Sequence, residues 1–219
     1  MLISAQQAIK HDYIPLTSLA SRAIDIRTAD AAKNSKIRDE ITRMMMRYLA
    51  TDTLLCWAPE KSIHDAATTE GATTSLRQKQ IAIAEPIIAY LKTHVFPGVE
   101  IYPILEEDSI MPRPQPEMTQ QIIKGWLLGL PAFELAALER GVLATKSLLV
   151  AIRLLVEWSQ EFRDVQQGAE KRFGIAEAAE ASTAEVTWQT GMWGEVEDTH
   201  DVDKEDLARQ LGSVILLVS

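Results

Sequence analysis

The side chains best suited to chemistry lie in one stretch near the C-terminus, residues 193–203, with the sequence WGEVEDTHDVD. Five carboxylates, one histidine and one tryptophan fall within these eleven residues, and two more acids follow at Glu205 and Asp206. Like charges repel one another and cannot be buried unpaired, so this charge density is costly to keep in a folded protein. Such a segment binds a partner, holds a metal ion, or stays solvated ahead of a helix.

Metal binding is one interpretation, because carboxylates and an imidazole can coordinate a divalent cation whose charge would relieve the repulsion. The spacing does not match a calcium loop, since the alternating acids, the central glycine and the distal glutamate do not line up. Paired carboxylates can also catalyse, but only in a cleft that separates their protonation states. The residues that would supply oxygen or nitrogen ligands are Glu195, Glu197, Asp198, His200, Asp201 and Asp203.

The same acids would also suit a purely structural role. Ahead of a helix they interact favourably with the positive end of the helix dipole, and we expect Asp203 to cap a last helix that runs to about Leu217. Elsewhere the sequence has no GxGxxG, GxxxxGK[ST], GxSxG or HExxH motif, so motifs predict neither a phosphate-binding loop nor a serine or zinc hydrolase. Contact with a protein partner is the third interpretation of residues 193–203.

The composition of the chain argues against some classes of binding partner. The 219 residues include 22 basic and 31 acidic side chains, a net charge of −9, which argues against nucleic acid or an anionic membrane as the main partner. No run approaches the roughly 18 apolar residues that cross a bilayer, so we expect no membrane insertion. The N-terminus resembles neither a signal peptide nor a transit peptide. The single cysteine, Cys56, lies in an apolar run, which predicts a buried and inert thiol in a reducing compartment.

Hydrophobic periodicity predicts a mainly α fold with many helices and at most one or two short strands. Apolar residues make up 47% of the chain, enough for a sizeable core. In the helix expected after Asn34 or Ser35, the apolar positions from Ile37 to Leu49 form one stripe. Further helices are expected from Pro15, over residues 76–84, from residue 117 to residue 156 and over residues 176–190.

Several breaks between these helices are also expected. Pro86 lacks an amide hydrogen, so we expect one helix to stop before it and a new one to run from Pro86 to Val95. Gly141 is a candidate boundary inside the long helical region. Residues 52–57 suggest a short strand or extended arm, residues 60–74 a loop, and the proline-rich residues 103–116 an extended crossing segment.

Four separated blocks of the sequence, the last of them in two adjoining parts, resemble one known family, the mitochondrial F1-ATPase assembly chaperones of the type that binds the alpha subunit. The similarity runs through nearly the whole chain and in the same order, so it is far more specific than a short motif. The blocks are PLTSLASRAID (15–25), TDTLLCWA (51–58), GWLLGLPAFELAALERGVLATKSLLVA (125–151), WGEVEDTHDVD (193–203) and DLARQLGSVILLVS (206–219).

The resemblance implies a fold and a role. Family members have an N-terminal β-rich domain and a C-terminal helical domain, which makes residues 15–219 the helical domain and residues 1–14 a remnant of, or connector to, the other. They hold the unassembled F1 alpha subunit in a soluble form until the beta subunit replaces them, in the mitochondrial matrix or in the cytoplasm of related bacteria. We therefore expect a monomeric chaperone that is not an enzyme, carries no cofactor or metal and binds no nucleic acid.

The resemblance also suggests partner-binding residues. The family motif places a glutamate and a glutamine ahead of the Trp-Gly pair, here Glu185 and Gln189, which share a helix face at i, i+4. We expect Glu185 to lie in a groove and contact the partner, although an ordinary exposed acid fits the sequence equally well. His200 could instead clasp its neighbouring carboxylates. The other residues expected to contact the partner are Trp193, Glu195, Glu197, Asp198, His200 and Asp201.

Two other functions remain open at this point. One is a metal-binding or metal-dependent hydrolytic domain centred on residues 195–203. The other is a helical adaptor for an unrelated protein partner. Trp126 and Trp158 are expected to belong to the core rather than to a binding surface.

Overall fold

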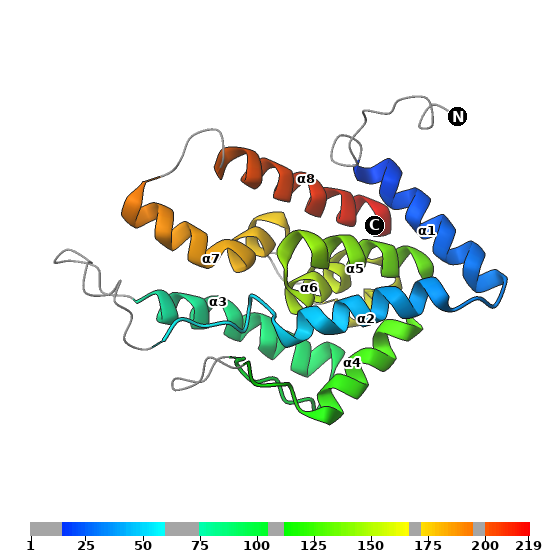
Figure 1. Ribbon diagram of the computed structural model, residues 1–219, viewed down its shortest axis with the longest axis horizontal. Coiled ribbons are helices and arrows are strands. Elements are labelled where there is room, and N and C mark those ends of the chain that lie inside the picture. The colour runs from blue at the N-terminus through cyan, green and yellow to red at the C-terminus, as the bar shows by residue number, and fades with distance from the viewer. Residues whose placement is uncertain (1–14, 60–74, 105–111, 167–171, 195–199) are drawn as a thin grey trace.

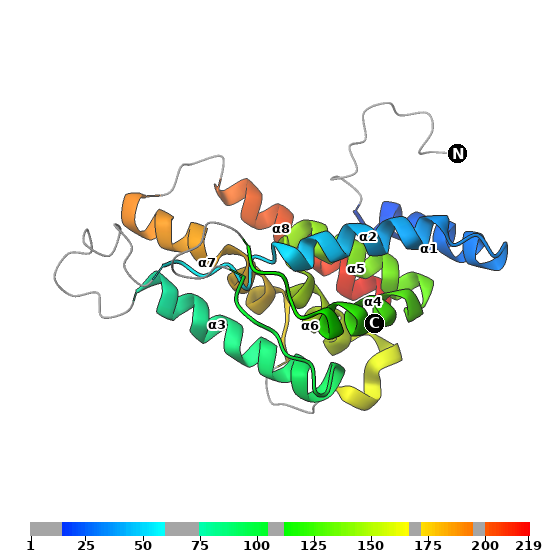
Figure 2. The ribbon, with the colours of Figure 1, turned by 60° about the horizontal axis from the view of Figure 1, so that its bottom comes forward.

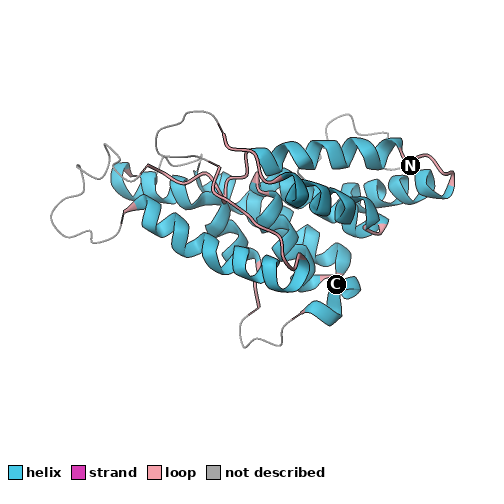
Figure 3. Ribbon diagram, turned by 90° about the horizontal axis from the view of Figure 1, so that it is seen from below, coloured by secondary structure: helices cyan, strands magenta, loops and turns pink. Residues whose placement is uncertain are grey.

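The computed structural model describes residues 15–59, 75–104, 112–166, 172–194 and 200–219. Within these ranges the chain is built from helices and connecting segments, with no strand, as Figure 3 shows. The predicted mainly α fold is therefore confirmed. The expected loop at residues 60–74 and the expected connector at residues 1–14 lie outside the described residues.

The helices are arranged around a central pair, α5 and α6 (Figure 1). Helix α5 packs against α1, α6 and α8, whereas α6 also contacts α2, α3 and α7. The bounds are α1 Pro15–Ala31, α2 Lys36–Ala50, α3 Leu76–Tyr90, the π-helical turn η2 Leu91–Val95, α4 Glu117–Gly129, α5 Ala132–Thr145, α6 Leu148–Trp158, the 3₁₀ turn η3 Gln160–Val165, α7 Ile175–Trp193 and α8 His200–Val218.

Helix α6 is apolar around nearly its whole circumference, which is why it occupies the centre. Nine of its eleven residues are buried, including Glu157. That carboxylate is held by two cations, Arg153 Nη1 at 2.6 Å and Arg172 Nε at 3.2 Å. Paired in this way, the charge can stay in the interior.

Gly141 lies inside α5 and does not separate two helices, so that expectation was wrong. A Cβ added at Gly141 would sit 3.1 Å from the Cβ of Ala151 on α6. The glycine thus allows the two central helices to approach closely, a packing role rather than a helix break. The boundary falls instead at Lys146, whose φ of 56° is left-handed, followed by Ser147, which caps α6.

Pro86 was also expected to end a helix, but α3 runs through it from Leu76 to Tyr90. Proline removes one amide donor from the helix, and burial of Ile87 and Leu91 in the core on the next turn holds the segment helical. The helix then widens into the π-helical turn, where the Phe96 amide donates to the Leu91 carbonyl at 2.7 Å.

Of the two forms expected for residues 52–57, a short strand or an extended arm, the strand does not form: residues 53–55 make a turn, and residues 56–59 carry no regular structure. The cause is the Asp52 carboxylate, which is fully buried. Its Oδ1 accepts from the Leu54 amide at 3.0 Å, and its Oδ2 accepts from the amides of Leu148 and Leu149 at 2.8 and 3.0 Å. Those two amides are free donors of the first turn of α6, so Asp52 folds its own segment back onto that helix.

The remaining predictions about helices are largely confirmed. Helix α1 begins at Pro15, α2 follows Ser35, and α7 covers the expected residues 176–190. Helix α8 begins at His200, so Asp203 lies inside the helix and the expectation that it caps the helix was wrong. The described parts of the crossing segment, residues 103–104 and 112–116, carry no regular structure and run beside α3 (Figure 2).

The two tryptophans expected in the core pack against it but are only half-buried. The Trp126 ring stacks on Phe162 with centroids 5.6 Å apart. Trp158 Nε1 donates to the Phe173 carbonyl at 2.8 Å, which ties the chain ahead of α7 to the end of α6.

Asp52 should make stability depend on pH. Burial raises the pKa of its carboxyl from 3.8 to about 6, so the stability linked to this group is complete below about pH 4 and is lost as pH rises through 6. Between pH 4 and pH 7 the unfolding free energy of the natural protein should therefore fall, relative to that of Asp52→Asn, by on the order of 3 kcal/mol. Urea unfolding of both proteins at each pH measures the difference; parallel pH profiles would contradict it.

Candidate partner-binding site

Glu185 is positioned by the packing of α7. The helix begins after Gly174, whose amide donates to Glu177 Oε2 at 2.9 Å in a capping interaction. Ala178, Ala181 and Ala184 are buried at a helical spacing, and α7 packs against α3. Small alanine side chains let the two helices lie close together, and Glu185 stands at the exposed edge of that contact.

A small groove of about 190 Å³ opens at this edge, between α7, α3 and the turn that follows α2. Glu185 and the exposed Val186 both line it. The other lining residues are Thr53, Leu54, Cys56, Gln80, Ile83, Ala181, Ser182 and Ala184.

The turn that forms one wall is held to α3 by Gln80, which is only 9% exposed. Its Oε1 accepts from the Ala58 amide at 2.7 Å and its Nε2 donates to the Cys56 carbonyl at 3.3 Å. Arg77 adds a bond from Nη1 to the Ala58 carbonyl at 2.9 Å. One glutamine thus satisfies both a donor and an acceptor of an irregular backbone that would otherwise lack partners.

The other end of the turn is tied to the α5–α6 connection. Thr53 donates from its amide to the Lys146 carbonyl at 3.3 Å and from its hydroxyl to the Thr145 carbonyl at 3.2 Å. The Ile104 amide donates to the Leu55 carbonyl at 3.0 Å. The wall of the groove is therefore anchored at both ends and is built into the fold.

Glu185 and Gln189 interact as the i, i+4 spacing predicts. Gln189 Nε2 donates to Glu185 Oε1 at 3.1 Å. This bond orients the carboxylate at the groove's edge while leaving it exposed to solvent, so its charge is accessible to a partner.

Cys56 is half-buried on the same groove, more accessible than the sequence predicted. Burial raises the pKa of its thiol above the ordinary value, and the negative charges of Asp52 and Glu185 add to the rise. The thiol is therefore protonated at neutral pH and a poor nucleophile. Among the described residues that line the groove, the side chains are apolar, polar or, at Glu185, acidic.

The acidic stretch lies between two helix ends. Helix α7 ends at Trp193, and Gly194 takes a φ of 89°, with its amide donating to the Thr190 carbonyl at 2.8 Å. Helix α8 begins at His200. Glu195, Glu197 and Asp198 lie outside the described residues, as do the side chains of Trp193, His200 and Asp201.

Among the described side chains, no three His, Cys, Asp or Glu residues lie close enough to hold a metal ion. This finding does not extend to residues 195–199, where the metal interpretation was centred. Of the helices in the described ranges, none combines the length and apolar character needed to cross a bilayer.

Comparison with known proteins gives a consistent result. The family described as ATP12 chaperone protein matches residues 4–92. The chain is 30% identical over 210 residues to the mitochondrial protein atp12 of Schizosaccharomyces pombe, covering 96% of this chain and 62% of that one. It is 31% identical over 218 residues to the mitochondrial ATP12 of Saccharomyces cerevisiae, covering 93% and 63%. The chain thus spans just over three fifths of the length of these relatives.

Solved structures share the fold. The crystal structure of Atp12 from Paracoccus denitrificans superposes with a TM-score of 0.66 at 19% identity, over 97% of this chain and 74% of that one. The Atu1473 protein of Agrobacterium tumefaciens gives a TM-score of 0.61 at 18% identity, over 92% and 64%.

We expect the side chain of Gln80 to stabilise the wall of the groove through its two hydrogen bonds to the backbone. Gln80→Leu keeps the size of the side chain but leaves the Ala58 amide and the Cys56 carbonyl without their partner, so it should lower the unfolding free energy by about 1–3 kcal/mol. Gln121→Leu, which removes an exposed bond to Glu117, is the matched control and should change it by less than about 0.5 kcal/mol. Equal effects in urea unfolding would show that Gln80 does not hold the wall.

Proposed function

Because the chain belongs to the ATP12 chaperone family, we propose that it is an assembly chaperone for the F1 sector of ATP synthase. In this role it binds the unassembled alpha subunit and prevents its aggregation until the beta subunit replaces it. The observation that carries the proposal is the similarity to two ATP12 proteins over more than nine tenths of this chain.

The physical setting supports this role. An unassembled subunit exposes surface meant for its neighbours, and large exposed apolar patches promote aggregation. A chaperone that covers such a surface must also leave when the proper partner arrives. Polar and charged contacts suit this exchange, because they steer association and discriminate between partners.

Glu185 and Gln189 are the proposed contacts on the groove. A groove of about 190 Å³ is smaller than the roughly 300–1,000 Å³ of typical small-molecule sites, and it matches the size of a side chain inserted by a partner. The Glu185 carboxylate at its edge would pair with a basic group on the alpha subunit, while Val186, 47% exposed, would contact an apolar one.

The acidic stretch is the second proposed contact. Its negative charge, in a chain of net charge −9, would attract a basic surface and speed encounter. Tryptophan is a common anchor at interfaces, which makes Trp193 the proposed apolar contact. The polar contacts proposed beside it are Glu195, Glu197, Asp198, His200 and Asp201.

We further propose that the protein works as a monomer, without catalysis, in the mitochondrial matrix, or in the cytoplasm if the source is bacterial. Both relatives are named as mitochondrial proteins. Residues 15–219 would form the helical domain, with residues 1–14 leading to it from a β-rich domain.

The proposal predicts selective capture of one subunit. In a co-expression pull-down, the tagged chain should retain the F1 alpha subunit and not the beta subunit. Retention should weaken between 50 mM and 500 mM salt, because exposed charge pairs are screened. Capture of neither subunit by the folded chain would contradict binding by this helical part, and repeating the experiment with a full-length relative separates that outcome from a wrong partner.

Glu185→Lys should weaken alpha-subunit binding by about 2 kcal/mol, or roughly thirtyfold in Kd, because it places a like charge against the proposed basic partner. The matched control is Glu180→Lys, which makes the same change at an exposed position of α7 outside the groove lining. It should leave Kd within about threefold. Titration calorimetry of folded variants measures both; equal losses would mean that only the net charge matters.

A further inference from the structure

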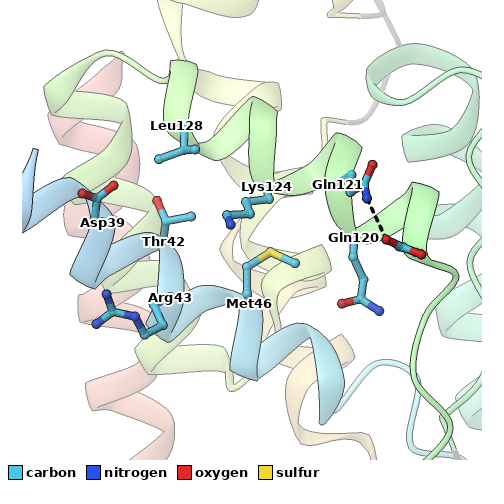
Figure 4. Close-up of a pocket in the computed structure, with 9 residues that line it drawn as sticks. Asp39, Thr42, Arg43, Met46, Gln120, Gln121, Lys124 and Leu128 are labelled. Atoms are coloured by element: carbon cyan, nitrogen blue, oxygen red, sulfur yellow. Dashed lines mark hydrogen bonds between the residues drawn. The ribbon is translucent and has the colours of Figure 1, made fainter.

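A second and larger groove, of about 600 Å³, lies between α2 and α4 (Figure 4). It shares no lining residue with the groove at Glu185. Residues at positions i, i+3, i+4 and i+7 of α2 form one wall, and α4 forms the other. The lining residues are Asp39, Thr42, Arg43, Met46, Glu117, Gln120, Gln121, Lys124 and Leu128.

Thr42 is the unusual member of this set. It is 2% exposed, yet its hydroxyl has no hydrogen-bond partner among the described residues. A buried hydroxyl without a partner is rare and destabilising. Several other threonines in helices donate to a carbonyl instead. Thr28, Thr93 and Thr183 donate to the carbonyl four residues earlier, each at 2.8 Å, and the buried Thr119 donates to the Glu100 carbonyl, in the segment ahead of α4, at 2.7 Å.

Lys124 supplies a positive charge at the same place. Its side chain extends from α4 across the groove toward Thr42 and Met46 (Figure 4). Within the described part of the chain, neither Lys124 nor Arg43 is engaged in an ion pair, and both are exposed. The groove thus combines the Thr42 hydroxyl, which has no hydrogen-bond partner among the described residues, with the Lys124 ammonium, which makes no ion pair there.

The two carboxylates of the lining each accept a hydrogen bond from a neutral side chain and keep their negative charge. Asp39 accepts from the Ser35 hydroxyl at 2.7 Å, and Glu117 accepts from Gln121 Nε2 at 2.9 Å. They lie on different helices, α2 and α4. Helix α2 itself carries four basic and two acidic side chains, in a protein whose overall charge is strongly negative.

Apolar surface flanks this polar centre. Met46 and Leu128 line the groove, and Met118 and Ile122 continue the exposed apolar surface of α4, at 68% and 39% exposure. A ligand that fits the whole groove therefore carries one acceptor with negative charge and apolar groups on either side of it.

We propose that the groove between α2 and α4 binds an acidic side chain, Asp or Glu, with apolar neighbours, on an extended segment of a partner polypeptide. Thr42 Oγ1 donates a hydrogen bond to the carboxylate, and Lys124 neutralises it. The flanking side chains of the segment pack on Met46 and Leu128. This proposal does not depend on which protein supplies the segment.

The test is an NMR titration of the isotopically labelled chain with three probes: acetyl-Leu-Glu-Leu-amide, its Gln counterpart, and acetate. The Glu peptide should produce saturable shifts at Thr42, Met46 and Lys124. The Gln peptide should bind about tenfold more weakly, since charge-assisted bonds are the stronger ones. Acetate should bind more weakly still, because it lacks the apolar groups.

Two substitutions separate binding from folding. Thr42→Val and Lys124→Gln should each raise the Kd of the Glu peptide about tenfold. Thr42→Val should leave Tm unchanged or raise it, because it removes a buried hydroxyl without a partner.

In the control Thr119→Val, Tm should fall, since the Glu100 carbonyl loses its donor, while peptide affinity stays the same. Lys92→Gln, exposed and outside the lining, should change neither.

The proposal is overturned by any of three results. The first is the absence of saturable shifts in the groove with the Glu peptide. The second is equal affinity for the Glu and Gln peptides or for acetate, which would mean that the groove does not select an acidic segment. The third is unchanged affinity in a folded Thr42→Val protein, which would leave the hydroxyl without a role.

Discussion

The buried Asp52 carboxylate is the constraint on which much of the rest of the fold depends. It accepts three backbone amides, one from its own turn and two from the first turn of α6. Helix α6 has nine of its eleven residues buried, and the free amides at its start need a partner inside the protein. A carboxylate 96 residues earlier in the chain provides one, which fixes the end of α2 against the centre of the fold.

The groove at Glu185 is a consequence of this arrangement. Asp52 turns the chain back, so that residues 53–56 run along α3 and face α7. Gln80 then satisfies the backbone of that turn, and the alanine face of α7 closes on α3. Glu185, the acid proposed to contact the partner, is therefore carried by the regular helix α7. The opposite wall of the groove is the irregular segment 53–56, which polar contacts hold in place.

The spacing of apolar residues in the sequence was sufficient to predict most of the helices. Apolar residues at helical spacing form one stripe, and a helix can bury that stripe against the core. Periodicity gave wrong helix ends where packing against another part of the fold decides the conformation of a residue. Pro86 was expected to break α3, but core burial of Ile87 and Leu91 keeps the helix intact. Gly141 is a candidate boundary in the sequence, but in the structure it lies inside α5, where a Cβ would crowd Ala151. The pairing of Glu185 with Gln189 is local and was predictable; the groove wall, more than 120 residues away in sequence, was not.

The two grooves differ in charge in a way that bears on the proposed function. The described lining of the one at Glu185 carries a single carboxylate, whereas the one between α2 and α4 carries Arg43 and Lys124 together with Asp39 and Glu117, and encloses the Thr42 hydroxyl that lacks a partner. Nothing in the local sequence marks Thr42, since most helical threonines bond to their own helix; only the approach of α4 encloses it. If each groove makes a modest contact alone, a client that engaged both would bind more firmly than through either one. Under the proposed function, a competing subunit could then displace the client from one groove at a time.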